Sequence, residues 1–225
     1  MKKMSSDETR TVCIGLFKNV KHRSLRSAKR CKARHYVGVE MAEWRVFPET
    51  SIDLSSYGFF GRGEFLREHI SEMNDEDWIV CPVQLKDYSS SIWDIQIGVT
   101  GKCKYGQEPY ESMLLEVEEE LGLRWNSNNT IQGVQTIDSR GNERTIFKIP
   151  IGNCIPIEKD DMPITGTRAN DTINKKIACL IYGTKDEIEK IVNKSNKIRY
   201  YSCNDDNIIG IAFVSIQTIK RHFKI

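Results

Sequence analysis

The sequence predicts a single α/β (α+β) domain in which helices cover a mixed sheet. Its 225 residues are 39% hydrophobic and 28% charged, which is the composition of a globular chain with one sizeable core. Apolar runs of strand length alternate with a few segments of helical periodicity, in an order that mixes the two types. Prolines and glycines are scattered between these runs, and no internal repeat is detectable. These three observations favour one layered sandwich.

The first half of the chain is predicted to supply strands and one helix. Apolar residues at helical spacing in EFLREHISEM (64–73) indicate the helix. His69 lies on its apolar face and is predicted to be a core histidine rather than a ligand. The last strand of this half is expected to run directly into a turn at Gly101 and Lys102. The predicted strands are 11–18, 35–47 (one or two strands), 77–85 and 91–101.

The second half is predicted to contain a hairpin, two more strands and further helices. The segment SRGNE (139–143) contains glycine and separates two apolar runs, which is typical of a β-hairpin. Thr184 and Glu187 have capping-box spacing at the start of a helix over 184–195. The remaining segments are the hairpin strands 130–138 and 144–152, the strands 175–183 and 207–216, and a helix over 217–223.

The segment GKCKYGQEPYESMLLEVEEELGL (101–123) predicts an amphipathic helix. Pro109 suits a first helical turn and Gly122 suits a helix end, so the helix should cover 109–121. Residues spaced three and four apart give this helix an apolar stripe that consists of Leu114, Val117 and Leu121.

Three glutamates of this helix are expected to share one patch. Glu116, Glu119 and Glu120 are spaced so that their carboxylates converge, whereas Glu118 points elsewhere. Like charges at this spacing and acids near a helix C-terminus oppose the fold by about 1 to 3 kcal/mol. A hard divalent cation such as Mg²⁺ would make this electrostatic contribution favourable, because it prefers oxygen ligands. The patch is therefore either half of a metal site or a solvated acidic face.

The positive charge is concentrated in one segment, although the net charge is only +2. No acidic residue occurs in 10–39, and basic residues crowd 18–36. Such a run can neutralise several phosphates of a nucleic acid. The segment is therefore either a phosphate-binding element, with Lys29, Arg30 and Lys32 as candidate RNA contacts, or a solvated loop.

The seven cysteines form no Cys-x-x-Cys pair, and the four histidines do not lie near them at zinc-finger spacing. Reduced thiols are therefore expected rather than a structural zinc site. No apolar run approaches the roughly 18 residues that a membrane span requires, and the first residues lack the apolar core of a signal peptide. A cytoplasmic (intracellular) protein with no membrane partner is expected.

The segment 101–123 resembles the Nudix box. That family's pattern is a glycine, five residues, a glutamate, seven residues, then Arg-Glu, an aliphatic, any residue, Glu-Glu, any residue, glycine and an aliphatic. Two positions depart from it: Gln107, followed by Glu108, stands at the loop glutamate, and Leu115 replaces the arginine that braces the glutamates in the family. The matching residues are Gly101, Glu116, Val117, Glu119, Glu120, Gly122 and Leu123.

The resemblance implies an α/β/α sandwich over 11–225, after a tail at 1–10. The stretch before the box is longer than is usual in the family, which implies an insertion or added lobe around 19–77. Family members that remove RNA caps, including those of large cytoplasmic DNA viruses, are similar in having such an elaboration. They also share a tryptophan before the box, as in WDIQIG (93–98).

The resemblance also implies hydrolysis of a pyrophosphate linkage with Mg²⁺ or Mn²⁺ as the cofactor. Glu119 is then either a third metal ligand or the catalytic base. Lys102 either contacts a substrate phosphate or is an exposed surface lysine. The implied metal ligands are Glu116, Glu119 and Glu120, and the reserve candidates for the base are Glu143, Asp205 and Asp206.

Three functions stay open for the chain. The first is a hydrolase of small nucleoside-diphosphate compounds, for which the basic segment would be incidental. The second is an RNA-decapping enzyme, in which that segment holds the capped transcript. The third is a catalytically weak Nudix-fold module that binds nucleotide or RNA, motivated by Gln107 and Leu115.

Overall fold

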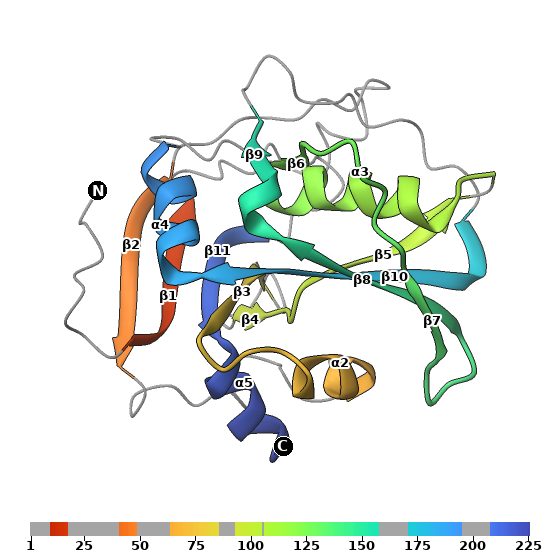
Figure 1. Cartoon of the computed structure of the whole chain (residues 1–225), viewed down its shortest axis with the longest axis horizontal. Helices are drawn as coiled ribbons and strands as arrows, with labels where there is room; N and C mark the ends of the chain where they lie inside the picture. The colour runs from red at the N-terminus through yellow and green to blue at the C-terminus, as the bar shows by residue number, and fades with distance from the viewer. Residues whose placement is uncertain are drawn as a thin grey trace.

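The structure is a computed structural model that describes residues 10–17, 41–48, 64–85, 93–104, 106–157, 171–194 and 208–225. A mixed sheet runs through the molecule, and helices lie on both of its faces (Figure 1). The predicted α/β (α+β) class is therefore confirmed.

The described strands and helices follow one another in mixed order along the chain. The strands are β1 (Arg10–Phe17), β2 (Met41–Pro48), β3 (Asp77–Leu85), β4 (Trp93–Ile95), β5 (Val99–Lys104), β6 (Leu123–Trp125), β7 (Val134–Ile137), β8 (Glu143–Pro150), β9 (Cys154–Pro156), β10 (Asp171–Thr184) and β11 (Ile208–Ser215). The helices are η3 (Glu64–Leu66), α2 (Arg67–Ser71), α3 (Pro109–Leu121), η4 (Ile151–Asn153), α4 (Lys185–Lys194) and α5 (Ile216–Phe223).

The main sheet has the strand order β2-β1-β11-β3-β10-β8-β7, and β6 pairs with β9 in a separate two-stranded sheet. The pair formed by β10 and β8 is parallel, whereas the other described pairs are antiparallel. On its other edge β10 pairs first with β5, at 171–179, and then with β3, at 181–184. The strand that precedes the box helix is thereby fixed to the longest strand of the sheet.

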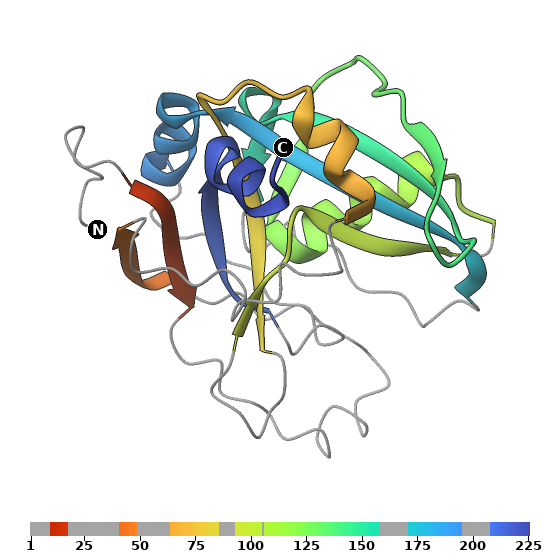
Figure 2. The same cartoon turned by 90° about the horizontal axis from the view of Figure 1, so that it is seen from below.

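The central part of strand β10, residues 177–181, is buried on both faces. Ile177, Cys179 and Ile181 belong to the core on the α3 side. Ala178 and Leu180 belong to the core on the side of α2 and α5, which lie in front of the sheet in Figure 2. Burial on both faces explains why this strand reads as a nearly continuous apolar run rather than as an alternating one.

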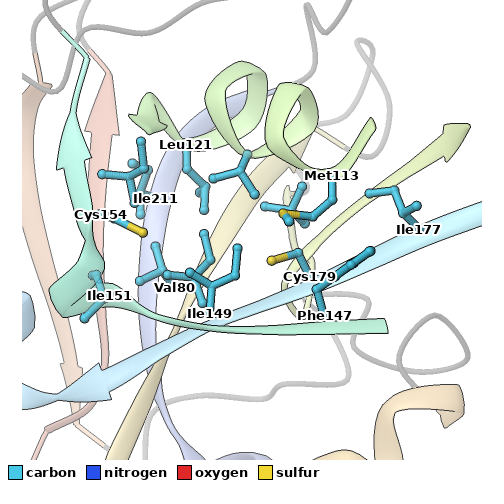
Figure 3. Close-up of a cluster of buried hydrophobic side chains, with 14 of the residues drawn as sticks. Val80, Met113, Leu121, Phe147, Ile149, Ile151, Cys154, Ile177, Cys179 and Ile211 are labelled. Atoms are coloured by element: carbon cyan, nitrogen blue, oxygen red, sulfur yellow. The ribbon is translucent and has the colours of Figure 1, made fainter. Parts of the chain in front are cut away.

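Helix α3 is held to the sheet by its apolar face. Met113 and Leu121 point from the helix toward the sheet residues Ile149, Phe147 and Cys179 (Figure 3). Both of these helical side chains are fully buried. Complete burial of such a side chain contributes about 1.5 to 3 kcal/mol to the free energy of unfolding. These contacts therefore hold the helix firmly on the sheet.

The stretch 91–101 differs from the prediction. The short strand β4 lies within it, and β5 begins at Val99 and continues past it, so that Gly101 and Lys102 lie inside β5 rather than in a turn. The break occurs at Gly98, which has φ +68° and whose added Cβ would lie 2.4 Å from the carbonyl oxygen of Cys179. Only glycine tolerates this conformation and this approach, so the chain turns there before it joins β10.

The hairpin and the capping box are confirmed. Strands β7 and β8 pair antiparallel, with Ile137 opposite Glu143. The backbone amide of Thr184 donates to Glu187 Oε2 at 2.9 Å, and the Glu187 amide donates to Thr184 Oγ1 at 3.3 Å. Both are short-range patterns that local sequence specifies.

Asp138 closes the hairpin between β7 and β8. Its carboxylate accepts hydrogen bonds from the backbone amides of Arg140 and Asn142 and from Arg144 Nε, the last at 2.8 Å. Burial of Asp138 opposes its charged form, but hydrogen bonds from Asn142, Arg140 and Arg144 outweigh it and hold the pKa well below the ordinary value. The Arg144 guanidinium also lies 4.1 Å from the centre of the Phe65 ring, which connects the hairpin to η3.

The described parts of the predicted insertion at 19–77 join the rest of the fold. Strand β2 pairs with β1, and Leu66 and Ile70 of η3 and α2 belong to the core beside α5. Of the predicted tail at 1–10, only Arg10 is described, and it begins β1. In the described ranges, no helix is both long and apolar enough to cross a membrane.

Candidate functional site

Helix α3 covers the predicted residues because its two ends are capped. At its start, the Glu108 amide donates to Glu111 Oε2 at 3.4 Å within a capping box, and Pro109 occupies the first turn. At its end, Gly122 has φ 60° and its amide donates to the Glu118 carbonyl oxygen at 3.1 Å. The carbonyl oxygen of Gly122 also accepts from the Ile157 amide at 2.9 Å, which fixes the end of the helix.

Two of the three predicted carboxylates are buried. Glu119 is 8% exposed and Glu120 is 3% exposed, whereas Glu116 is half-buried. The prediction that these acids form a solvated face is therefore wrong for Glu119 and Glu120. Glu118 forms a separate ion pair, in which its Oε1 lies 2.7 Å from Arg124 Nε of β6. Glu118 is thus held by a partner of its own, apart from Glu119 and Glu120.

Strand β5 and helix α3 come close together at Gly101 and Glu116. A Cβ added to Gly101 would lie 2.4 Å from Glu116 Cδ and 2.5 Å from its Oε1. The side chain of Glu116 therefore fills the space that any other residue at 101 would need. This contact explains in physical terms why a glycine precedes the helix at this position.

Gln96 contacts Glu120, and sequence reasoning missed this residue. Its Nε2 donates to Glu120 Oε2 at 3.2 Å and to the Gly98 carbonyl oxygen at 3.1 Å. Gln96 is only 8% exposed. The one signal in the sequence is a polar residue at a buried position of the apolar run WDIQIG, 24 residues before Glu120.

The two residues that differ from the Nudix pattern, Gln107 and Leu115, have different surroundings. Gln107 Oε1 accepts a hydrogen bond from Ser112 Oγ at 3.3 Å, so this amide joins the loop to the first turns of α3. Leu115 is half-buried and brings no hydrogen-bond donor to the glutamates. One hydrogen-bond donor to Glu120 comes from Gln96, which lies outside the helix.

The buried thiols near α3 stay protonated. Burial raises the pKa of the Cys154 thiol to about 12. Burial, with added effects of Cys154 and Glu120, raises the pKa of Cys179 well above its ordinary value. Burial also raises the pKa of Cys103, although a hydrogen bond with Ser112 opposes the shift. These cysteines therefore behave as small apolar residues rather than nucleophiles or ligands.

The remaining candidate residues fall into two groups. Lys102 is exposed on β5 opposite Lys176 of β10, and Glu143 is exposed at the start of β8. His69 of α2 is partly exposed rather than a core residue, and burial and Lys148 lower its pKa. The candidates outside the described residues are Lys29, Arg30, Lys32, Asp205 and Asp206.

The donor set on α3 suits a hard divalent cation by type, because carboxylate oxygens are the ligands that Mg²⁺ and Mn²⁺ prefer. In the part of the chain that the structure describes, no group of three or more His, Cys, Asp and Glu side chains is arranged to hold a metal ion. Mg²⁺ commonly takes only one or two carboxylates and completes its coordination with water and substrate phosphates. Glu116, Glu119 and Glu120 as metal ligands stay a prediction.

Comparisons with family models, with curated proteins and with solved structures find no match for this chain. Membership of the Nudix family therefore stays a hypothesis based on the box residues. The structure adds two contacts that are independent of sequence similarity. One joins Gly101 to Glu116, and the other joins Gln96 to Glu120.

Proposed function

We propose that this protein is a Nudix-type hydrolase that cleaves a pyrophosphate linkage in a nucleoside-diphosphate-linked substrate. The observation that carries the proposal is the burial of Glu119 and Glu120, at 8% and 3% exposure, on a helix whose sequence resembles the Nudix box. Carboxylates are rarely buried without a structural or functional reason, because removing their charge from water is unfavourable.

The electrostatics of α3 support a cation-dependent activity. The acids lie in the last turns of the helix, where the macrodipole disfavours negative charge. The Gln96 amide that donates to Glu120 is uncharged, so this hydrogen bond orients the carboxylate without itself supplying a positive charge. A divalent cation beside these carboxylates would replace their mutual repulsion by attraction to the cation.

The chain's own residues would hold the ion and prepare the nucleophile. Bound Mg²⁺ or Mn²⁺ supplies neutralisation of phosphate oxygens and a water of lowered pKa. In this proposal Glu116 and Glu120 are ligands, and Glu119 is either a third ligand or the general base that accepts the proton of the attacking water. The contact with Gly101 restricts the positions that the Glu116 carboxylate can adopt.

The 5′ cap of RNA is our preferred substrate within this class. The basic segment that contains Lys29, Arg30 and Lys32 motivates this choice, because a run of cations binds a phosphodiester chain without sequence preference. A small nucleotide would need no such segment. Turnover of capped RNA should therefore fall steeply between low and physiological salt, whereas turnover of a small nucleotide should change little.

One assay tests the activity directly. The purified chain is incubated with capped RNA and with a panel of nucleoside-diphosphate compounds, each with Mg²⁺, with Mn²⁺ and with a chelator, and the products are identified by mass. We expect products of pyrophosphate cleavage only when a divalent ion is present. Hydrolysis that survives the chelator would contradict the proposal.

A binding module is the second candidate function, and two residues favour it. Gln107 and Leu115 are uncharged where the box has a glutamate and an arginine, and Gln107 is hydrogen-bonded to Ser112. A site altered in this way could bind a nucleotide without hydrolysing it. Saturable binding of capped RNA or nucleotide, together with no product from any substrate in the assay above, would establish this function instead.

A further inference from the structure

We infer that Gln96 is a positioning residue that orients the Glu120 carboxylate for cation binding. The inference rests on the proposed function and extends it to a residue outside the box. The Leu115 side chain has no hydrogen-bond donor, so it cannot brace the glutamates of its own helix. In this inference the neutral amide of Gln96 takes that bracing role.

Hydrogen bonds of both its backbone and its side chain fix Gln96 between β4 and β5. Its backbone amide donates to the Pro82 carbonyl oxygen of β3 at 2.9 Å. Its side-chain Nε2 donates to the Gly98 carbonyl oxygen at 3.1 Å and to Glu120 Oε2 at 3.2 Å. With 8% exposure, the side chain has little room to rotate away. The amide is therefore held in place before any ligand binds.

Two acceptors of Nε2, the Gly98 carbonyl oxygen and Glu120 Oε2, indicate the orientation of the amide. The Gly98 carbonyl oxygen accepts hydrogen bonds only, as does an ionised Glu120 carboxylate. Only the nitrogen of the Gln96 amide can donate to both, so the reversed amide would face two acceptors with an oxygen. The contact thus fixes the Gln96 amide in one orientation and holds the Oε2 atom of Glu120 against its nitrogen.

The turn at Gly98 aims its carbonyl oxygen at Gln96. Gly98 has φ +68°, and a Cβ there would lie 2.4 Å from the Cys179 carbonyl oxygen. The turn is therefore fixed against β10 by sterics rather than by a flexible side chain. A rigid sheet on one side and a capped helix on the other hold Gln96 and Glu120 at hydrogen-bonding distance. Such supporting contacts keep metal-binding side chains in the orientation that binding requires.

Gln96→Met tests the inference, because methionine keeps an unbranched side chain and removes both donors. Mn²⁺ affinity is measured by electron paramagnetic resonance on the full chain, and turnover is measured on the same samples. We expect Mn²⁺ affinity to fall about 10- to 100-fold, the range found for partners that orient metal ligands. Gln135→Met is the matched control, because it removes an exposed amide on β7 and should leave the affinity unchanged.

A double-mutant cycle with Glu120→Gln separates orientation from general structure. If Gln96 acts through Glu120, adding Gln96→Met to Glu120→Gln should weaken Mn²⁺ binding no further. Equal losses in both backgrounds would overturn the inference. Wild-type affinity in Gln96→Met would also overturn it and would leave the proposed function standing. A wild-type chain that binds no Mn²⁺ would overturn both.

Nuclear magnetic resonance on the wild-type chain gives a readout that does not depend on the variant's folding. The side-chain amide protons of Gln96 should shift when Mg²⁺ is added, because the carboxylate that they contact changes its charge environment. The amide protons of exposed Gln135 should not move. A Gln96 amide that is insensitive to Mg²⁺, in a protein that binds the ion, would overturn the inference.

Discussion

Gly101 and Glu116 lie so close that a Cβ on residue 101 would be 2.4 Å from Glu116 Cδ. The contact joins the strand before the box helix to a carboxylate in the middle of that helix. It shows that the glycine and the glutamate are not independent features of the sequence. A side chain added at residue 101 would therefore have to displace the Glu116 carboxylate.

Gly101→Ala should displace the Glu116 side chain and weaken cation binding. We expect the Mn²⁺ affinity to fall about 10- to 100-fold, the range found when a metal ligand is no longer held in its proper position. Calorimetric titration of the apo chain with Mn²⁺ measures this. Gly152→Ala is the control, since its added Cβ would come no nearer than 3.1 Å to the flexible end of Glu187. Unchanged affinity in Gly101→Ala would argue against a role for Glu116 as a ligand.

Glu119→Gln and Glu120→Gln should each abolish turnover while the chain stays folded. Replacing a carboxylate by an amide keeps its size but removes the negative charge that a cation requires. Glu118→Gln is the matched control on the same helix. It removes only the partly exposed ion pair with Arg124, so turnover should persist and stability should fall by about 0.2 to 1 kcal/mol. Loss of turnover in all three variants would indicate general damage to α3.

Asp138→Asn should destabilise the chain at neutral pH and much less in acid. The folded pKa of Asp138 is lowered, so its contribution is complete above the unfolded pKa of about 3.9 and is lost as the pH falls toward the folded pKa. Urea denaturation of wild type and variant at several pH values below neutrality measures the difference. Asp186→Asn, at an exposed position of α4, is the control. A difference that stays constant with pH would contradict this account of the hairpin.

Replacing Lys29, Arg30 and Lys32 by glutamine should weaken turnover of capped RNA and spare a free cap analogue. Loss of three phosphate contacts to a single strand should reduce the slope of log activity against log salt by about 2. A triple glutamine variant at exposed positions, Arg140, Lys190 and Lys224, changes the net charge equally and serves as the control. Equal losses on RNA and cap analogue would discredit the RNA-binding role.

Local signals in the sequence predicted the box helix and the hairpin. Pro109 and Gly122 mark the two ends of α3 because each suits one terminus and disfavours continuation. The glycine-containing turn between β7 and β8 and the pair Thr184 and Glu187 act within a few residues. Spacing along a helix is likewise local, so the separation of Glu118 from the other acids could be anticipated.

The features that sequence reasoning missed depend on residues far apart in the chain. Gly98 looked like any glycine in an apolar strand, and its conformation follows from the approach to Cys179 of β10. The burial of Glu119 and Glu120 depends on how α3 packs on the sheet, which helical periodicity does not reveal. The contact of Gln96 with Glu120 spans 24 residues, and no pairing rule links an amide between two strands to an acid in a helix.

The position of β11 between β1 and β3 has a consequence for biosynthesis. Those two strands emerge from the ribosome much earlier, and each would expose an unpaired edge toward the other until 208–215 has been made. Unpaired edges are sites of intermolecular aggregation. A chain truncated before β11 should therefore be insoluble. Chaperones that shield strand edges should be needed until the ribosome has synthesised β11.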